Sequence, residues 1–313
     1  MSENAPDRAL GDAVPAAVPH SAELRCRANG IELAYDCFGT DDAPPLVLIM
    51  GLGCQMIAWD EAFCARLAAA GYRVIRFDNR DIGKSTLLPQ LGVPDIAEMF
   101  AAIARGDNVS APYLLRDMAA DLAGLLDVLA IEQAHVVGAS MGGAIAQKLA
   151  IDWPRRVRTL TSIMSNTGEA GFPPPTPAAL SLLLTPPPLE RKAYIADYAK
   201  RWQLLRGAGF AQDEAMDPGR AERIFDRGLN PAGVARQLAA IIASPGRARA
   251  LAGLRVPALV MHGDADPLVH VSGGIATAEA IPGARLRILE GMGHALPLPY
   301  WSDVIAALAR HCV

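Results

Sequence analysis

The stretch "VVGASMGGAIAQ", Val136–Gln147, decides how the middle of the chain folds. An apolar run typical of a buried strand ends at Ser140, and a helical pattern begins directly after it. Gly138 and Gly142 flank the serine and remove side chains where a tight strand-to-helix turn would be crowded. The stretch therefore predicts a strand–turn–helix unit that presents the Ser140 hydroxyl at the carboxyl edge of a sheet.

The same alternation of strand and helix extends in both directions from this unit. Apolar or alternating runs predict strands over 22–28, 31–38, 45–50, 73–78, 134–140 and 157–165, within 258–269, and over 284–290. Helical patterns cover about 59–70, 113–130, the residues from 142, and a closing segment from about 300. Strands joined through helices pair in parallel, which predicts an α/β fold, and the Asn29-Gly30 turn between the first two runs adds an antiparallel edge.

One long segment interrupts the alternation and suggests how the chain is divided. Between 166 and 245 the sequence carries two Pro triplets and helical patterns without strands. We expect an all-helical lid there, inserted between core segments 21–165 and 246–313, because such insertions often cover a site. If Pro173–Pro175 and Pro186–Pro188 stiffen the lid, Gly replacements should change KM and kcat together. Residues 1–20 are rich in Ala, Pro and acidic residues and are expected to be a disordered tail.

Composition excludes several classes of partner. The 313 residues are 51% hydrophobic, with a formal net charge of -4 and no run of Lys or Arg, which argues against nucleic acid and anionic membrane surfaces. No apolar stretch is long enough to span a membrane, and the N-terminus lacks the features of a signal peptide. The five cysteines have no metal-binding or disulfide spacing, so we expect free thiols, no metal and a cytoplasmic protein.

Two other glycine-containing stretches resemble nucleotide-binding motifs but fail on detail. "IMGLGCQM" places Gly51 and Gly53 as a dinucleotide fingerprint would, yet Met56 stands where the third glycine is needed. "FDNRDIGKST" ends like a phosphate loop, yet Asp78 occupies the position of its first glycine, where an acid would repel phosphate. The sequence therefore predicts no cofactor, and Asp78, Asn79 and Arg80 are interpreted as structural residues.

A serine nucleophile needs a base and an acid that orients the base. His294 in "GMGHALP" follows the last predicted strand between small residues and is the best candidate for the base, whereas His262 and His270 are interpreted as structural or rim residues. In "VMHGDADPLVH" both Asp264 and Asp266 could be the acid. Asp266 is favoured because it lies deeper in the loop. The order Ser140, Asp266, His294 is the one that α/β-hydrolases use.

With these residues in order, the chain after its tail resembles the α/β-hydrolase superfamily, and within it aclacinomycin methylesterase and related bacterial carboxylesterases. "LVLIMGLG", "FDNRDIGKST", "VVGASMGG", "HGDADPLV" and "GMGHALP" carry the resemblance. It implies a mostly parallel eight-stranded sheet, a catalytic Ser140, Asp266 and His294, and an oxyanion hole made by the backbone N–H groups of Leu52 and Met141. Met50 departs from the histidine usual in the wider superfamily, where that histidine supports the loop that carries the oxyanion hole.

The expected function is hydrolysis of carboxylic esters through an acyl-enzyme. The substrate would be an uncharged ester with a short or medium acyl chain, or a methyl ester of a bulky hydrophobic acid, because "AALSLLL", Trp202, Leu204, Leu205, Phe210 and Ile224 suggest an apolar lid. The same triad also serves C–C bond hydrolases, haloperoxidase-like perhydrolases, amidases and acyltransferases, and a ligand receptor on this fold is a further alternative. Monomer and dimer stay open.

Overall fold

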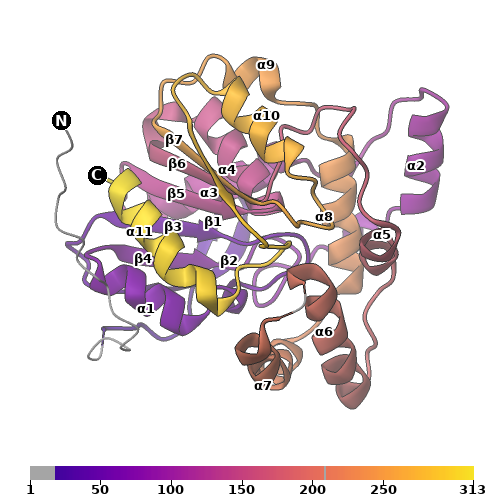
Figure 1. The fold of residues 1–313 in the computed structure, drawn as a ribbon, viewed down its shortest axis with the longest axis horizontal. Helices are drawn as coiled ribbons and strands as arrows, with labels where there is room; N and C mark the ends of the chain where they lie inside the picture. The colour runs from indigo at the N-terminus through magenta and orange to yellow at the C-terminus, as the bar shows by residue number, and fades with distance from the viewer. Residues whose placement is uncertain (1–17, 208) are drawn as a thin grey trace.

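The computed structural model describes residues 18–207 and 209–313 and shows one twisted sheet with helices on both faces (Figure 1). The sheet contains eight strands in the order β1-β2-β4-β3-β5-β6-β7-β8. Their bounds are β1 Leu24–Ala28, β2 Ile31–Phe38, β3 Pro45–Ile49, β4 Arg73–Phe77, β5 Ala134–Ala139, β6 Val157–Ile163, β7 Ala258–Gly263 and β8 Arg285–Leu289. Each lies within one of the runs expected from the sequence.

The strand directions confirm a mostly parallel sheet with an antiparallel edge. β2 runs antiparallel to both β1 and β4, and every other neighbouring pair is parallel. Ala28 pairs with Ile31 across a two-residue turn in which Asn29 and Gly30 have φ angles of 47° and 80°. Positive φ at both central positions is the hairpin geometry that Asn-Gly favours.

Helices cover the two faces of the sheet and bury its apolar side chains. On one face lie α1 (Glu61–Ala69) and α11 (Trp301–His311), and on the other α3 (Leu115–Val128), α4 (Met141–Asp152) and α10 (Ser272–Ala280). The strands in the middle are buried on both faces, which explains their continuous apolar sequences. Short 3₁₀ turns occur at Met56–Ala58, Pro89–Leu91, Pro154–Arg156 and Leu298–Tyr300.

Between β6 and β7 the described residues form helices and no strand. These are α5 (Pro177–Leu184), α6 (Arg191–Arg206), α7 (Ala211–Arg227), α8 (Pro231–Ala243) and α9 (Ala248–Leu251), with α5 to α8 grouped beside one edge of the sheet (Figure 1). A further helix, α2 (Ile96–Ala104), has no counterpart among the elements expected from the sequence. It stands away from the sheet, and only Met99 of this helix is buried.

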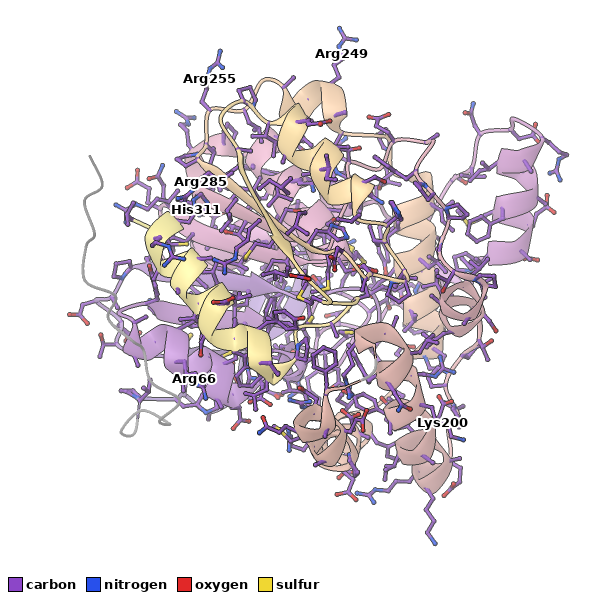
Figure 2. All side chains as sticks on the ribbon, viewed as in Figure 1. Arg66, Lys200, Arg249, Arg255, Arg285 and His311 are labelled. Carbon is purple, nitrogen blue, oxygen red and sulfur yellow. The ribbon has the colours of Figure 1, made fainter. Side chains whose placement is uncertain are left out.

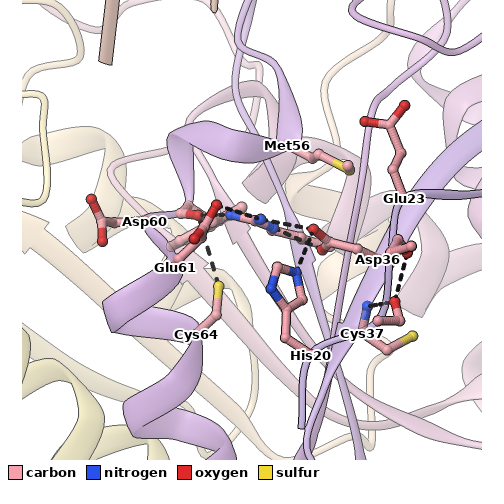
Figure 3. Close-up of polar contacts among 12 residues, drawn as sticks. His20, Glu23, Asp36, Cys37, Met56, Asp60, Glu61 and Cys64 are labelled. Atoms are coloured by element: carbon pink, nitrogen blue, oxygen red, sulfur yellow. Dashed lines mark hydrogen bonds and ion pairs between the residues drawn. The ribbon is translucent and has the colours of Figure 1, made fainter. Parts of the chain in front are cut away.

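The N-terminal segment is attached to the sheet at His20. Residues 1–17 of the expected tail lie outside the described residues, whereas the His20 ring stacks on Phe38 with centroids 3.9 Å apart. His20 Nε2 lies 3.1 Å from a carboxylate oxygen of Asp36, and the same carboxylate accepts hydrogen bonds of 2.8 and 2.7 Å from Arg76 (Figure 3). Arg76 and Asp36 are buried together, so each supplies the charge partner that the other needs.

The surface shows dispersed basic side chains. Figure 2 shows Arg249 and Arg255 pointing outward at one end of the molecule and Lys200 at the opposite end. Within residues 18–207 and 209–313, no helix combines the length and the apolar character that crossing a membrane would require.

Candidate active site

Ser140 lies at the sharp turn between β5 and α4, as its flanking glycines predict. Its backbone is held at φ 55° and ψ −121°, a conformation that side-chain-bearing residues rarely adopt. A β-carbon added at Gly138 would lie 2.0 Å from the carbonyl oxygen of Gly142, and one added at Gly142 would lie 2.2 Å from that of Ile49. The glycines therefore allow β3, β5 and α4 to approach closely enough to hold the strained serine.

The structure brings His294 and Asp266 to this serine. His294 Nε2 lies 2.9 Å from Ser140 Oγ, and His294 Nδ1 lies 2.7 Å from Asp266 Oδ2. The serine follows β5, the aspartate follows β7 and the histidine follows β8, so all three are at the carboxyl ends of parallel strands. His294 and Asp266 are buried, which strengthens the charge interaction between them.

The two candidate aspartates make different contacts. Asp266 Oδ1 accepts hydrogen bonds of 2.8 Å from the backbone N–H groups of both Leu268 and Val269. Burial alone would raise the pKa of Asp266, but the neighbouring His294 and the hydrogen bonds to its carboxylate outweigh burial and hold the pKa below its usual range. Asp264 instead accepts a 2.6 Å hydrogen bond from the Gly291 backbone and helps to order the loop that carries His294.

Leu52 and Met141 are on the two segments that border the serine hydroxyl. A β-carbon added at Gly51 would lie 3.1 Å from the Ser140 β-carbon and 3.6 Å from its Oγ, so the loop after β3 lies against the turn. Met141 is the first residue of α4, where backbone N–H groups have no partner within the helix. Across the described ranges, the N–H of Leu52 donates no hydrogen bond either.

Two side chains hold the loop after β3, and one of them, Gln237, was not singled out by the sequence. Asn79 Nδ2 donates a 3.0 Å hydrogen bond to the Met50 carbonyl, at the position where the superfamily histidine is missing. Gln237 of α8 accepts a 2.9 Å hydrogen bond from the Gly53 N–H and donates one of 2.8 Å to the Arg80 carbonyl. Asn79 was expected to be structural, whereas Gln237 is 184 residues from Gly53 and gave no local signal.

Asp78 binds backbone groups of two loops. Its carboxylate accepts hydrogen bonds of 2.6 Å from the Met56 N–H and 2.8 Å from the Lys84 N–H, and it forms an ion pair with Arg227 of α7. Burial raises the pKa of Asp78 to about 6. A β-carbon at Gly83 would lie 2.2 Å from this carboxylate. This close approach explains why the stretch that resembled a phosphate loop has a glycine at this position.

Ser140 and His294 open into a cavity of about 390 Å³ between the core and the helices that follow β6. Leu182–Leu184, Trp202, Leu205 and Ile224 line it, as the sequence suggested. The cavity also has a charged region that the sequence did not reveal, formed by Asp60, Arg206, Asp213, Asp217 and Arg220.

Two residues expected to form the apolar ceiling lie elsewhere. Leu204 is exposed, and Phe210 packs against Tyr300 with ring centroids 6.1 Å apart. Helical spacing identifies the face of a helix but does not show which face lies over a cavity.

The other histidines within the described ranges have structural contacts. His135 is buried and lies 2.9 Å from Thr159 Oγ1, and His270 lies 2.9 Å from Ser272 Oγ. His311 contacts Arg285 at 2.8 Å, and Figure 2 shows these two side chains next to each other. In the same ranges, His, Cys, Asp and Glu side chains form no group of three or more that could hold a metal ion.

Comparison with known proteins agrees with this architecture. Residues 44–299 match the family described as alpha/beta hydrolase fold. Rhodomycin D methylesterase DauP of Streptomyces sp. (strain C5) is 31% identical over 295 residues, which cover 85% of this chain and 90% of that protein. Among solved structures, the esterase RhEst1 from Rhodococcus sp. ECU1013 is similar with a TM-score of 0.71 at 20% identity, covering 94% of this chain and 100% of that one.

A second solved structure is 2-hydroxy-6-oxo-6-phenylhexa-2,4-dienoate hydrolase from Rhodococcus sp. strain RHA1. Its TM-score is 0.71 at 20% identity, and the match covers 94% of this chain and 99% of that one. At this identity the two solved structures show the fold alone. The family match and the identity to the methylesterase go further, and they show that this chain belongs to the α/β hydrolase fold family.

Proposed function

We propose that this protein is a serine esterase that hydrolyses carboxylic esters through an acyl-enzyme. The observation that carries the proposal is the hydrogen-bonded series Ser140–His294–Asp266, with distances of 2.9 and 2.7 Å, at the base of a cavity. Membership of the α/β hydrolase fold family and the similarity to rhodomycin D methylesterases support ester hydrolysis.

In the proposed mechanism, Ser140 Oγ attacks the ester carbonyl while His294 Nε2 removes its proton. The carbonyl oxygen becomes an oxyanion between the N–H groups of Leu52 and Met141, and the partial positive charge at the start of α4 stabilises it. His294 then protonates the departing alcohol. A water molecule, activated by the same imidazole, attacks the acyl-enzyme and releases the acid, and Asp266 stabilises the imidazolium in both steps.

The cavity favours an uncharged, largely apolar substrate. The buried and partly buried charged side chains of its charged region are paired with one another: Asp213 bonds to Arg220 at 3.0 Å, and Arg206 bonds to Asp217 at 2.9 Å. The exposed Arg223 also lines the cavity. A charged substrate would have to displace such a pair, and breaking a buried pair is costly. A methyl ester of a bulky hydrophobic acid is proposed to occupy the volume of about 390 Å³, since two relatives are named methylesterases.

The helices α5 to α8 are proposed to act as the lid over this cavity, with residues 166–245 as its extent. Arg220 and Arg227 of α7 form ion pairs with Asp60 and Asp78 of the core, and these pairs would hold the lid in place. We also propose a cytoplasmic location, because all five cysteines are free thiols.

The test is hydrolysis of p-nitrophenyl esters of increasing chain length and of methyl esters of polycyclic acids, with Ser140→Ala in parallel. Sustained turnover by the wild type that falls by several powers of ten in the variant supports the proposal. The chain length of the ester that is hydrolysed fastest then indicates the size of the acyl pocket. Absence of ester turnover by a folded protein that instead cleaves a vinylogous 1,5-diketone would favour a C–C bond hydrolase. A single slow turnover would favour a receptor.

A further inference from the structure

His262 is a second imidazole beside the Asp266 carboxylate. It lies in β7, and its ring is fully buried. His262 Nε2 lies 2.8 Å from the Val269 carbonyl oxygen and 3.3 Å from Asp266 Oδ2. Both neighbours are hydrogen-bond acceptors, and Asp266 Oδ2 is the same oxygen that faces His294 Nδ1. One carboxylate oxygen therefore lies between two histidine rings.

The surroundings of the other ring nitrogen fix the position of the hydrogen. His262 Nδ1 is buried, and no partner within the described ranges bonds to it. A β-carbon added at Gly274 would lie 2.4 Å from Nδ1, so the backbone of α10 packs directly on this nitrogen. A hydrogen on Nδ1 would be a buried donor without an acceptor, which is unfavourable. The ring therefore carries its hydrogen on Nε2, between Val269 and Asp266.

We propose that His262 is a positioning residue for the reaction, an inference that rests on the proposed esterase function. Its Nε2–H fixes the orientation of Asp266 Oδ2 and takes up part of the negative charge on that oxygen. Leu268 and Val269 fix the other oxygen, Oδ1, through their backbone N–H groups. His262 and His294 are the titratable groups in contact with the carboxylate within the described ranges, and α10 places the backbone of Gly274 against the His262 ring.

This arrangement predicts two effects of removing the Nε2–H. Without it the carboxylate can rotate and point less accurately at His294, so kcat should fall while KM stays close to wild type. The charge on Oδ2 also becomes more available to the His294 imidazolium, so the acid limb of the kcat/KM profile should move to higher pH. The loss of a hydrogen bond to a charged group corresponds to a fall of about 10- to 100-fold in kcat.

Two amide variants of similar polarity test the proposal in the full-length protein. In His262→Gln the side-chain amide can reach the position of Nε2, whereas in His262→Asn it ends near Nδ1 and faces Gly274. We expect His262→Asn to show the fall in kcat and the displaced acid limb with p-nitrophenyl acetate, and His262→Gln to recover most of both. Equal loss of stability in both variants, with wild-type kcat and an unchanged acid limb, would reduce His262 to a structural residue.

A measurement on the wild-type protein remains available if the variants do not fold. In protein labelled with ¹⁵N-histidine, NMR at pH 8 should show the His262 ring with hydrogen on Nε2 and none on Nδ1, assigned by its contacts with Gly274. The opposite tautomer would overturn the proposal. Turnover of p-nitrophenyl acetate by the wild-type protein tests the esterase function separately. If wild type shows no turnover, the esterase proposal fails, and the NMR result still reports the tautomer of His262.

Discussion

The backbone N–H of His294 donates a 2.6 Å hydrogen bond to the backbone carbonyl of Leu205 in α6. The loop that carries the proposed base is therefore bound to the helices over the cavity as well as to the sheet. Gly293 makes this contact possible, because a β-carbon at that position would lie 2.2 Å from the Leu205 oxygen. The position of the base and the position of the lid are coupled through this one close approach.

Gly293→Ala should therefore displace His294 from Ser140. A displacement of about 1 Å can reduce the rate by about 100-fold, so we expect a fall of that order in kcat, measured by steady-state ester hydrolysis. Gly219→Ala is the matched control, because within the described ranges its new β-carbon would meet only the flexible end of an arginine, at 3.8 Å. Unchanged kcat in folded Gly293→Ala would show that the contact with Leu205 does not position the base.

Asp266→Asn should lower kcat by about 10⁴-fold, because the amide cannot stabilise the His294 imidazolium and favours the wrong tautomer. Asp264→Asn retains an oxygen that can accept the Gly291 hydrogen bond, and it should keep activity close to wild type. Kinetics of the two variants with one p-nitrophenyl ester check the assignment. If only Asp264→Asn lost activity, Asp264 and not Asp266 would be assigned as the acid that orients His294.

Gln237→Ala should loosen the loop that carries Leu52, because the Gly53 N–H loses its acceptor. We expect a fall of about tenfold in kcat with little change in KM, less than the loss caused by deleting an oxyanion donor itself. Gln133→Ala, at an exposed site, is the control. An increase in KM with constant kcat would indicate that Gln237 acts on substrate binding instead.

Asp78 should give the protein a measurable dependence of stability on pH. Its pKa of about 6 in the folded state is above the ordinary value of 3.8, so the folded state binds this proton more tightly than the unfolded state. The contribution of this proton to the free energy of unfolding is fully present below about pH 4 and is lost as pH rises through about 6. The resulting change in the free energy of unfolding is on the order of 3 kcal/mol. The unfolding free energy of wild type should therefore fall relative to that of Asp78→Asn as pH rises through this interval.

Denaturant unfolding of both proteins at several pH values between 4.5 and 7.5 measures this difference. The alternative is that the ion pair with Arg227 keeps Asp78 charged throughout the interval. The difference between wild type and variant would then be independent of pH, which would contradict the prediction.

Much of the fold could be read from short segments because its signals are local. The apolar runs of β3, β5 and β7 and the helical spacing of α3 reflect burial on a fixed period, which a sequence shows directly. The turn at Ser140 is also local, since the glycines that relieve it are two residues away on either side. α2 was missed although Asp95, whose side chain accepts a hydrogen bond from the Glu98 N–H, and Gly106, with φ 83°, mark its two ends. It stands apart from the sheet, and only Met99 of this helix is buried.

The sequence by itself determined the strand order in the chain, the turn at Ser140, and the candidates Asp266 and His294. Only the tertiary structure decided which groups support them: Gln237 reaches Gly53 from α8, and His262 shares the Asp266 carboxylate. The first contact joins residues 184 positions apart, and such neighbours leave no periodic signal in the sequence. His262 and Asp266 are only four residues apart, and they meet because the loop after β7 folds back onto the His262 ring. Backbone conformation follows from nearby residues, whereas hydrogen-bond partners follow from the packing of the whole domain.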